Sequence, residues 1–174
     1  MIITKDQLKN AVPNLKQSKA DLYFDPINKC LEKYQINTNK RIACFLAQIG
    51  HESCSFVFVK ELASGLAYEG RHDLGNNQDG DGVRFKGRGL IQITGRNNYQ
   101  TLSEAFQVDF VNKPELLEQP EFATLSAGWF WDKKKLNQLA DVGKFKEIAR
   151  IINGGFNGLD DRIKRLEHAK KVFP

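Results

Sequence analysis

Two glutamates, Glu52 and Glu61, have the residue type and the spacing that could carry out chemistry. Apolar residues that recur at i, i+3, i+4 and i+7 predict a helix with one buried face before Glu52: Ile42, Phe45, Leu46 and Ile49. Glu52 continues this stripe, so its carboxylate should lie near the apolar face and near the negative end of the helix dipole. Both effects raise the pKa of a carboxyl group, so we expect Glu52 to hold a proton near neutral pH and to act as a general acid.

Glu61 follows nine positions later (61 − 52), after the apolar run Phe56–Val59, which we expect to be extended. Nine residues reach at most about 30 Å, so a turn after the helix could bring Glu61 back opposite Glu52. Two carboxylates in different environments suit glycoside hydrolysis, in which one protonates the leaving oxygen and the other activates water or attacks the sugar. A structural glutamate at a helix end and a surface glutamate would give the same pattern.

The composition is that of a water-soluble globular chain with a moderate positive charge. Of 174 residues, 41% are hydrophobic and 27% charged, and 26 Lys and Arg against 21 Asp and Glu give a net charge of +5. This charge favours an anionic partner, such as nucleic acid, a membrane surface or an anionic cell-wall polymer. We expect no nucleic-acid binding, because the chain has neither a long basic run nor basic residues interleaved with aromatic ones.

The chain shows no signal for export, membrane insertion, disulfides or metal binding. Its first ten residues lack the apolar region of a secretory signal, and no window approaches the roughly 18 apolar residues of a membrane-spanning helix. Cys30, Cys44 and Cys54 lack CxxC spacing, so we expect reduced thiols in a protein made in the cytoplasm. We expect no metal and no cofactor.

Three known motifs begin in the sequence but are not completed. His51-Glu52 would need a second histidine at position 55 for a zinc-protease motif, and Ser55 is there. The segment 77–88 starts like a calcium loop but ends in Arg88, so we expect a solvated polar turn. Gly87 and Gly89 start a dinucleotide fingerprint, but Gln92 replaces its third glycine.

Helical patterns cover most of the chain. We expect a helix at Lys5–Val12 capped by Thr4, and helical character over Ser18–Tyr34 with a restart at Asp25-Pro26. The central helix should run from about Lys40 to Ser53, capped by residues 37–39. Further helices are expected at Asn98–Phe106, Pro114–Gln119, Glu121–Lys133, Phe145–Ile152 and Leu159–Val172.

Residues 63–95 differ from the rest of the chain because they contain eight glycines, which exclude a continuous helix. The pieces that start at Gly82 and Gly89 look extended, so we expect a small hairpin beside a cleft. Backbone in this region could approach a ligand closely.

Four motifs, AQIGHES, FVKEL, GRGLIQIT and INGGFNG, occur in the order seen in glycoside hydrolase family 19. The chain therefore resembles this family of chitinases and bacteriophage endolysins over about Ala43–Leu166, and its C-terminal part is most similar to the lysozyme-type phage members. The resemblance implies a mainly α-helical, two-lobed, lysozyme-like fold, with a small hairpin and loop region beside the cleft and a single catalytic domain spanning residues 1–174.

The resemblance also implies roles for individual residues. Glu52 matches the general acid, Glu61 the general base, and Thr94 the hydroxyl that holds the attacking water. The matched substrate-contacting positions are Gln92, Asn98 and Asn153, and Arg162 matches a basic residue tied to the carboxylates. Without the family, Gln92, Thr94, Asn98 and Asn153 would be interpreted as hydrogen-bonding residues of turns.

Two departures from plant chitinases shape the expected function. The segment between the HES and FVKE motifs is shorter than in the plant enzymes, and Asn97 replaces their tyrosine. We therefore expect an open groove. The resemblance implies an inverting phage endolysin, which we expect to be a monomer. It would cleave the β-1,4 bond between N-acetylmuramic acid and N-acetylglucosamine in peptidoglycan, after a holin releases it from the host cytoplasm. The alternatives are a chitinase and a catalytically silent glycan-binding protein.

Overall fold

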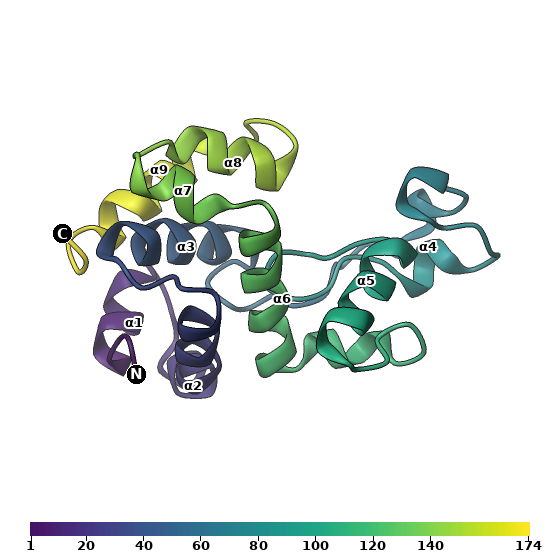
Figure 1. Cartoon of the computed structure of the whole chain (residues 1–174), viewed down its shortest axis with the longest axis horizontal. Coiled ribbons are helices and arrows are strands. Elements are labelled where there is room, and N and C mark those ends of the chain that lie inside the picture. The colour runs from purple at the N-terminus through teal and green to yellow at the C-terminus, as the bar shows by residue number, and fades with distance from the viewer.

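The computed structural model describes residues 1–174 and is built almost entirely from helices, which confirms the predicted fold class. In chain order the elements are α1 (Lys5–Ala11), α2 (Gln17–Lys33), α3 (Asn39–Glu52), η1 (Leu66–Tyr68), η2 (His72–Leu74), α4 (Asp81–Arg84), α5 (Arg96–Phe106), η3 (Pro114–Glu118), α6 (Pro120–Lys133), α7 (Leu136–Asp141), α8 (Phe145–Asn153) and α9 (Leu159–Ala169). The helices α1–α3 and α7–α9 form a large lobe that carries both termini, and α4 and α5 lie in a smaller lobe (Figure 1). Helix α6 and extended stretches of chain, here called the waist (residues 58–62 and 86–94), join the two lobes.

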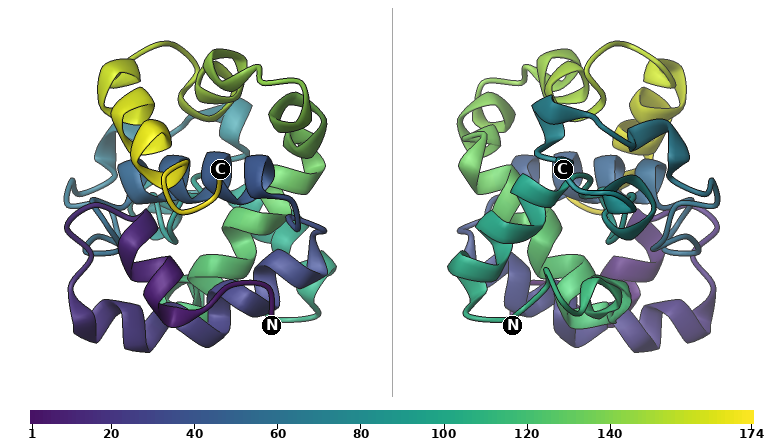
Figure 2. Two further views of the ribbon diagram at one scale, coloured as in Figure 1. Left: turned by 90° about the vertical axis from the view of Figure 1, so that its left-hand side faces the viewer. Right: turned by 90° about the vertical axis from the view of Figure 1, so that its right-hand side faces the viewer.

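Helix α3 is the central helix of the large lobe. Every residue from Ile42 to Gly50 is buried, and α9, α7 and α1 all pack against it (Figure 2). Its start agrees with the prediction, because the Thr38 hydroxyl accepts a hydrogen bond from the Arg41 N–H at 3.3 Å. With apolar neighbours on most sides, α3 is fixed in place and carries Glu52 at its last position.

Helix α1 starts as predicted, with a capping box between Thr4 and Gln7. The predicted restart at Asp25-Pro26 is wrong, because α2 continues through Pro26. Proline in a helix leaves the carbonyl four residues earlier without its partner. That carbonyl belongs to Leu22, which is half exposed and can be hydrated, while the buried face of α2 keeps the helix continuous.

The prediction of an extended Phe56–Val59 is wrong in its first half, because residues 53–57 form a turn. Cys54, Ser55 and Phe56 have φ angles of 51°, 57° and 65°, a left-handed run that costs about 1–2 kcal/mol per residue. The run is stabilised by Ser53, whose hydroxyl accepts the Phe56 N–H at 2.9 Å, and by the fully buried Phe56 ring, 5.1 Å from that of Tyr23. The turn sends the chain from the end of α3 into the waist.

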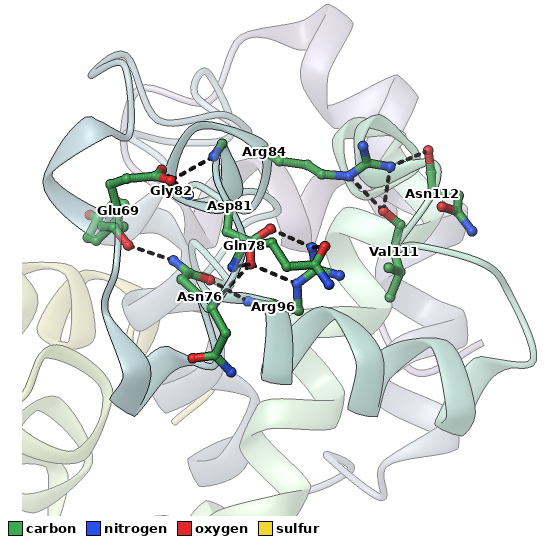
Figure 3. Close-up of polar contacts among 12 residues, drawn as sticks. Glu69, Asn76, Gln78, Asp81, Gly82, Arg84, Arg96, Val111 and Asn112 are labelled. Carbon is green, nitrogen blue, oxygen red and sulfur yellow. Dashed lines mark hydrogen bonds and ion pairs between the residues drawn. The ribbon is translucent and has the colours of Figure 1, made fainter.

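In the small lobe, the piece that starts at Gly82 is helical and not extended, since it lies in α4. The segment before it is the exposed polar turn that was expected at residues 77–80, but the Asp81 side chain that follows is not solvated. Asp81 is buried, accepts hydrogen bonds from the N–H groups of Asn77 and Gln78 at 3.0 Å, and pairs with Arg96 of α5 (Figure 3). Hydrogen bonding to Arg96 holds the pKa of Asp81 below its ordinary value.

Close backbone contacts explain a glycine of this lobe. The Glu69 carboxylate accepts hydrogen bonds from the N–H groups of Gly80 and Gly82 at 2.6 and 2.8 Å. A Cβ placed on Gly82 would lie 2.5 Å from the Glu69 backbone nitrogen, so only glycine fits there. Arg84 of α4 reaches the Val111 carbonyl at 3.0 Å and connects α4 to the segment before η3 (Figure 3).

The hairpin expected beside the cleft is reduced to two isolated antiparallel bridges, Lys60 with Arg88 and Arg88 with Ile93. Arg88 and Ile93 exchange both backbone hydrogen bonds, at 3.0 and 2.8 Å, around a tight loop. The Arg88 side chain is buried and donates to Glu118 and to the Tyr99 hydroxyl. The waist is therefore stabilised by side chains as well as by its few backbone bonds.

The C-terminal helices α5, η3, α6, α8 and α9 lie within a few residues of their predicted bounds, and α7 was not predicted. One contiguous apolar cluster contains residues from both lobes, among them Phe45 in α3 and Tyr99 in α5.

Gly128 of α6 lets the helix pass close to α2, because a Cβ there would lie 2.3 Å from the Tyr34 ring. None of the helices combines the length and the apolar character that crossing a membrane requires.

Candidate active site

Glu52 is paired with a buried arginine. Arg162 of α9 is 1% exposed and donates from Nη2 to Glu52 Oε1 and from Nη1 to Gln48 Oε1, the latter at 2.5 Å. The Glu52 side chain is 18% exposed, so the carboxylate can still be reached from solvent. The sequence predicted an apolar environment for Glu52, but the structure places the positively charged Arg162 of α9 beside its carboxylate. The tie between Arg162 and a carboxylate, implied by the resemblance, is present.

Two buried donors beside Glu52 have no partner. They are Nε2 of Gln48 and Nε of Arg162. An unpaired buried donor costs about 1–3 kcal/mol, and such groups are uncommon outside sites that bind water or a ligand. Gln48 was not predicted as a site residue, although it lies one helical turn before Glu52 on α3.

Glu61 lies in the waist, where its carboxylate is fixed at both oxygens. Oε1 accepts from the Tyr68 hydroxyl at 3.1 Å, and Oε2 accepts from the Gly87 N–H at 3.0 Å. The Glu61 N–H also donates to the Gly87 carbonyl at 2.9 Å. Burial and the neighbouring Glu61 carboxylate raise the pKa of Tyr68 above its ordinary value. Tyr68 was not predicted, because nothing in its spacing connects η1 to the waist.

Gln92 lies on the same side of Gly87 as the Glu61 carboxylate. A Cβ placed on Gly87 would be 2.7 Å from Gln92 Oε1 and 3.2 Å from Glu61 Oε2, so both groups lie against this glycine. Gln92 itself has a φ of 56° and donates from Nε2 to the Gly89 carbonyl at 2.9 Å. The structure thus brings Gln92 next to Glu61.

Thr94 and Asn98 are linked to Gln92 by two further hydrogen bonds. The Thr94 hydroxyl donates to the Gln92 carbonyl at 3.0 Å, which leaves its oxygen lone pairs free to accept. The Asn98 amide donates to the Thr94 carbonyl at 2.7 Å. Gln92 and Thr94 therefore lie in the waist, and Asn98 lies in the first turn of α5.

Asn153 is not part of the hydrogen-bonded group of Gln92, Thr94 and Asn98. It is exposed at the end of α8 and makes no side-chain hydrogen bond, and Gly154 ends the helix in the left-handed conformation. The loop that follows comes back to α3, because a Cβ on Gly158 would lie 2.5 Å from the His51 ring. The INGG loop is thus placed against the residue before Glu52.

His51 has a structural role that sequence reasoning missed. Its Nδ1 lies 2.7 Å from Asp161 Oδ2, and Arg165 donates from Nε to the same oxygen at 2.7 Å. Burial opposes the ionised form of Asp161, but hydrogen bonds from Arg165 and His51 keep its pKa below the ordinary value. These contacts attach the start of α9, and with it Arg162, to the end of α3.

The two carboxylates have separate partners. Glu52 bonds to α9 in the large lobe, while Glu61 bonds to Tyr68 and to the waist.

An apolar cavity of about 260 Å³ lies at the opposite end of α3, next to Lys40 and Cys44, and is not part of this site. Acidic and histidine side chains do not gather anywhere in groups of three or more that could hold a metal ion.

Comparisons with known proteins identify the family of this chain. The family model described as chitinase class I, of glycoside hydrolase family 19, matches residues 32–143. A family 19 domain-containing protein of Haemophilus influenzae is 29% identical, over 81% of this chain and 84% of its own. An endochitinase of Arabidopsis thaliana is 34% identical over 67% of this chain and 40% of its own length.

Solved structures share the fold. Chitinase C of Streptomyces griseus superposes with a TM-score of 0.78 and 21% identity, over 99% of this chain and 76% of that one. A bacterial family 19 chitinase gives a TM-score of 0.79 and 22% identity, over 99% and 95% of the two chains. The chain spans only about half of a Pisum sativum endochitinase, 55% of its length. With its matched region covering most of the chain, this protein belongs to glycoside hydrolase family 19 and is a glycosidase.

Proposed function

We propose that residues 1–174 form one catalytic domain that hydrolyses a β-1,4 glycosidic bond with inversion, using Glu52 as general acid and Glu61 as general base. The observation that carries the proposal is the separate fixation of the two carboxylates, Glu52 by Arg162 and Glu61 by Tyr68 and the Gly87 N–H. Different surroundings are what two carboxyl groups need in order to take different roles. An inverting reaction requires them to lie about 6.5–9.5 Å apart, with the attacking water between them.

On the base side, Glu61 is held at both oxygens and takes a proton from water. Its hydrogen bonds to Tyr68 and Gly87 leave lone pairs for that water, since each carboxylate oxygen accepts more than one bond. Thr94 would accept a second hydrogen bond from the water, because its own proton goes to the Gln92 carbonyl. Two fixed acceptors orient the water for attack on the anomeric carbon.

On the acid side, Glu52 protonates the leaving oxygen and Arg162 positions its carboxyl group. The unpaired donors of Gln48 and Arg162 lie in this part of the site. Asn153 and Asn98 would contact sugar hydroxyl or acetamide groups from opposite lobes, because one ends α8 and the other lies in α5. Amide side chains suit this task, since each both donates and accepts.

We propose peptidoglycan as the substrate and phage-induced host lysis as the context. The support is the net charge of +5, which favours an anionic wall, and the short connection between Glu52 and Glu61, which leaves the groove open. In this proposal the protein acts as a monomer, accumulates in the host cytoplasm and reaches the wall through a holin.

Chitin is the second candidate substrate. The observation that favours it is the name of several relatives, which are endochitinases of Pisum sativum and Arabidopsis thaliana. A chitinase would release reducing ends from chitin oligomers and none from peptidoglycan. The proposed endolysin would release reducing ends from peptidoglycan and none from chitin oligomers.

The test compares wild type with Glu52→Gln on purified peptidoglycan and on chitin oligomers, with reducing-end release as the readout and circular dichroism as the check of folding. We expect turnover by wild type on peptidoglycan and its loss, by about 100-fold or more, in a folded Glu52→Gln variant. Full turnover by the variant would exclude Glu52 as the acid. Binding without turnover by wild type would show a silent glycan-binding protein.

A further inference from the structure

The segment Val57–Leu62, which carries Glu61, has an unpaired edge. The Val59 carbonyl accepts from the Gly89 N–H and the Glu61 N–H donates to the Gly87 carbonyl, both at 2.9 Å, so these groups face the waist. In an extended segment, backbone groups of the residue between them point the opposite way. The N–H and C=O of Lys60 indeed make no hydrogen bond within the chain. This edge can therefore pair with another extended chain.

A hollow of about 380 Å³ lies along this segment, lined by Val57, Phe58, Val59, Lys60, Glu61, Leu62 and Lys86. Its volume falls within the roughly 300–1,000 Å³ of small-molecule sites. Three large apolar side chains are exposed here, Val57 by 42%, Phe58 by 41% and Leu62 by 82%. Exposed edges are usually protected by charged residues, so a run of exposed apolar groups beside a hollow indicates a binding surface.

Two lysines give the hollow a positive charge. Lys86 donates to the Ala63 carbonyl at 2.9 Å, and Lys60 lies 3.4 Å from Glu118. Each ammonium group has three donors, so both keep donors for a ligand. The one acidic residue of the hollow, Glu61, already has partners at both carboxylate oxygens. The ligand that fits is an extended chain with apolar groups and at least one carboxylate.

We propose that this edge binds the stem peptide of the peptidoglycan strand while the glycan lies at the catalytic carboxylates, an inference that rests on the proposed function. The stem is a short peptide with free carboxylates, joined to the lactyl group of the muramyl sugar. Because Glu61 lies in the same segment, a muramyl sugar beside Glu61 places its peptide along Lys60. The peptide would pair with the Lys60 backbone, as in strand addition, and its carboxylates would meet Lys60 and Lys86. Chitin has no such peptide, so this contact makes the enzyme selective for peptidoglycan.

The first test uses Lys60→Pro, which removes a backbone N–H that is free in the protein, and Lys60→Ala, which removes the ammonium group and keeps that N–H. The substrates are intact glycan strands and the same strands stripped of stem peptides by an amidase. We expect wild type to have a kcat/KM about tenfold higher on stem-bearing strands. Lys60→Pro should lose this preference, Lys60→Ala should lose part of it, and both should cleave stripped strands like wild type.

The second test covers the case in which Lys60→Pro also slows cleavage of stripped strands by distorting the waist. It uses the double variant Phe58→Ser, Leu62→Ser, with Val142→Ser as the matched control, since Val142 is equally apolar and 67% exposed but lies between α7 and α8. Calorimetry with a stem tetrapeptide should show binding to wild type and Val142→Ser, and binding at least tenfold weaker to the double variant.

The outcomes separate the two proposals. Equal kcat/KM of wild type on stem-bearing and stripped strands, or equal tetrapeptide binding by wild type and the double variant, would overturn the peptide site and leave the proposed hydrolysis standing. No cleavage of either kind of strand by wild type would overturn the proposed function itself.

Discussion

Arg162 and Glu52, 110 positions apart in the chain, form an ion pair that joins α9 to the last residue of α3. The Arg162 side chain is 2% exposed and the Glu52 side chain 18%, so the pair lies at the boundary between core and groove. Helix α9 thus helps to set the position of Glu52, a residue far from it in the sequence. Activity and stability should therefore both depend on α9.

Replacement of Arg162 tests this coupling. In Arg162→Met the Glu52 carboxylate loses its partner in a partly buried position, and we expect a loss of about 3 kcal/mol in the free energy of unfolding together with loss of activity. Urea denaturation measures the first and reducing-end release the second. Arg150→Met, at an exposed position of α8, is the matched control. An Arg162→Met protein as stable and active as wild type would contradict this dependence.

Tyr68 should matter for catalysis more than for folding. Tyr68→Phe removes the hydroxyl that donates to Glu61 at 3.1 Å, and we expect kcat to fall about tenfold with little change in stability. Tyr23→Phe is the control, because the Tyr23 hydroxyl makes no hydrogen bond and lies in the large lobe. Equal kcat values for the two variants would show that the Tyr68 hydroxyl does not position the base.

Gly87 and Gly128 should separate activity from stability. A methyl group at Gly87 would press on Gln92 and Glu61, so Gly87→Ala should lower activity at least tenfold. A methyl group at Gly128 would collide with Tyr34 and Cys30 where α6 packs on α2, so Gly128→Ala should lower the melting temperature. Thermal unfolding and activity measured on both proteins check this contrast, which full activity in Gly87→Ala would refute.

Asp81 should make the small lobe sensitive to acid. Its pKa is below the ordinary value of 3.8 because of Arg96, so its stabilisation is complete above about pH 4 and is lost as pH falls through the folded-state pKa. Asp81→Asn should therefore be less stable than wild type by about 2 kcal/mol near neutral pH. In urea denaturation the difference should shrink toward about pH 2. A difference independent of pH would show that ionisation of Asp81 does not contribute.

The positive charge should make cleavage of the wall sensitive to salt. Salt screens attraction between a +5 protein and anionic peptidoglycan, so the rate of wall lysis should fall as ionic strength rises. Circular dichroism over the same salt range serves as the control and should show unchanged folding. Wall lysis that is indifferent to ionic strength would remove charge as an argument for the substrate.

The periodic part of the fold could be predicted from the sequence. Helices with a regular apolar stripe, such as α3 and α8, lie close to their expected bounds, because side-chain periodicity determines which face is buried. The break expected at Pro26 does not occur, since packing of the α2 face outweighs one lost hydrogen bond. Tertiary burial of Phe56 likewise imposes a turn on a run with strand composition.

Part of the candidate site was predicted from motifs and from the resemblance. The motifs gave Glu52 and Glu61, and the wider resemblance gave Arg162; the structure pairs Glu52 with Arg162 and places Gln92 beside Glu61. Tyr68 and Gln48 could not be found in this way, because their roles arise from contacts between segments that spacing alone does not bring together. One available signal was the position of Gln48, one helical turn before Glu52.

The configuration of the first product tests the central claim most directly. Time-resolved NMR of the newly formed reducing end, recorded before mutarotation, shows whether water attacks opposite the leaving group. Attack by water held at Glu61 on a β-linked sugar predicts the α-anomer as the first product. The β-anomer as the first product would mean that a carboxylate attacks the sugar, and would contradict the account.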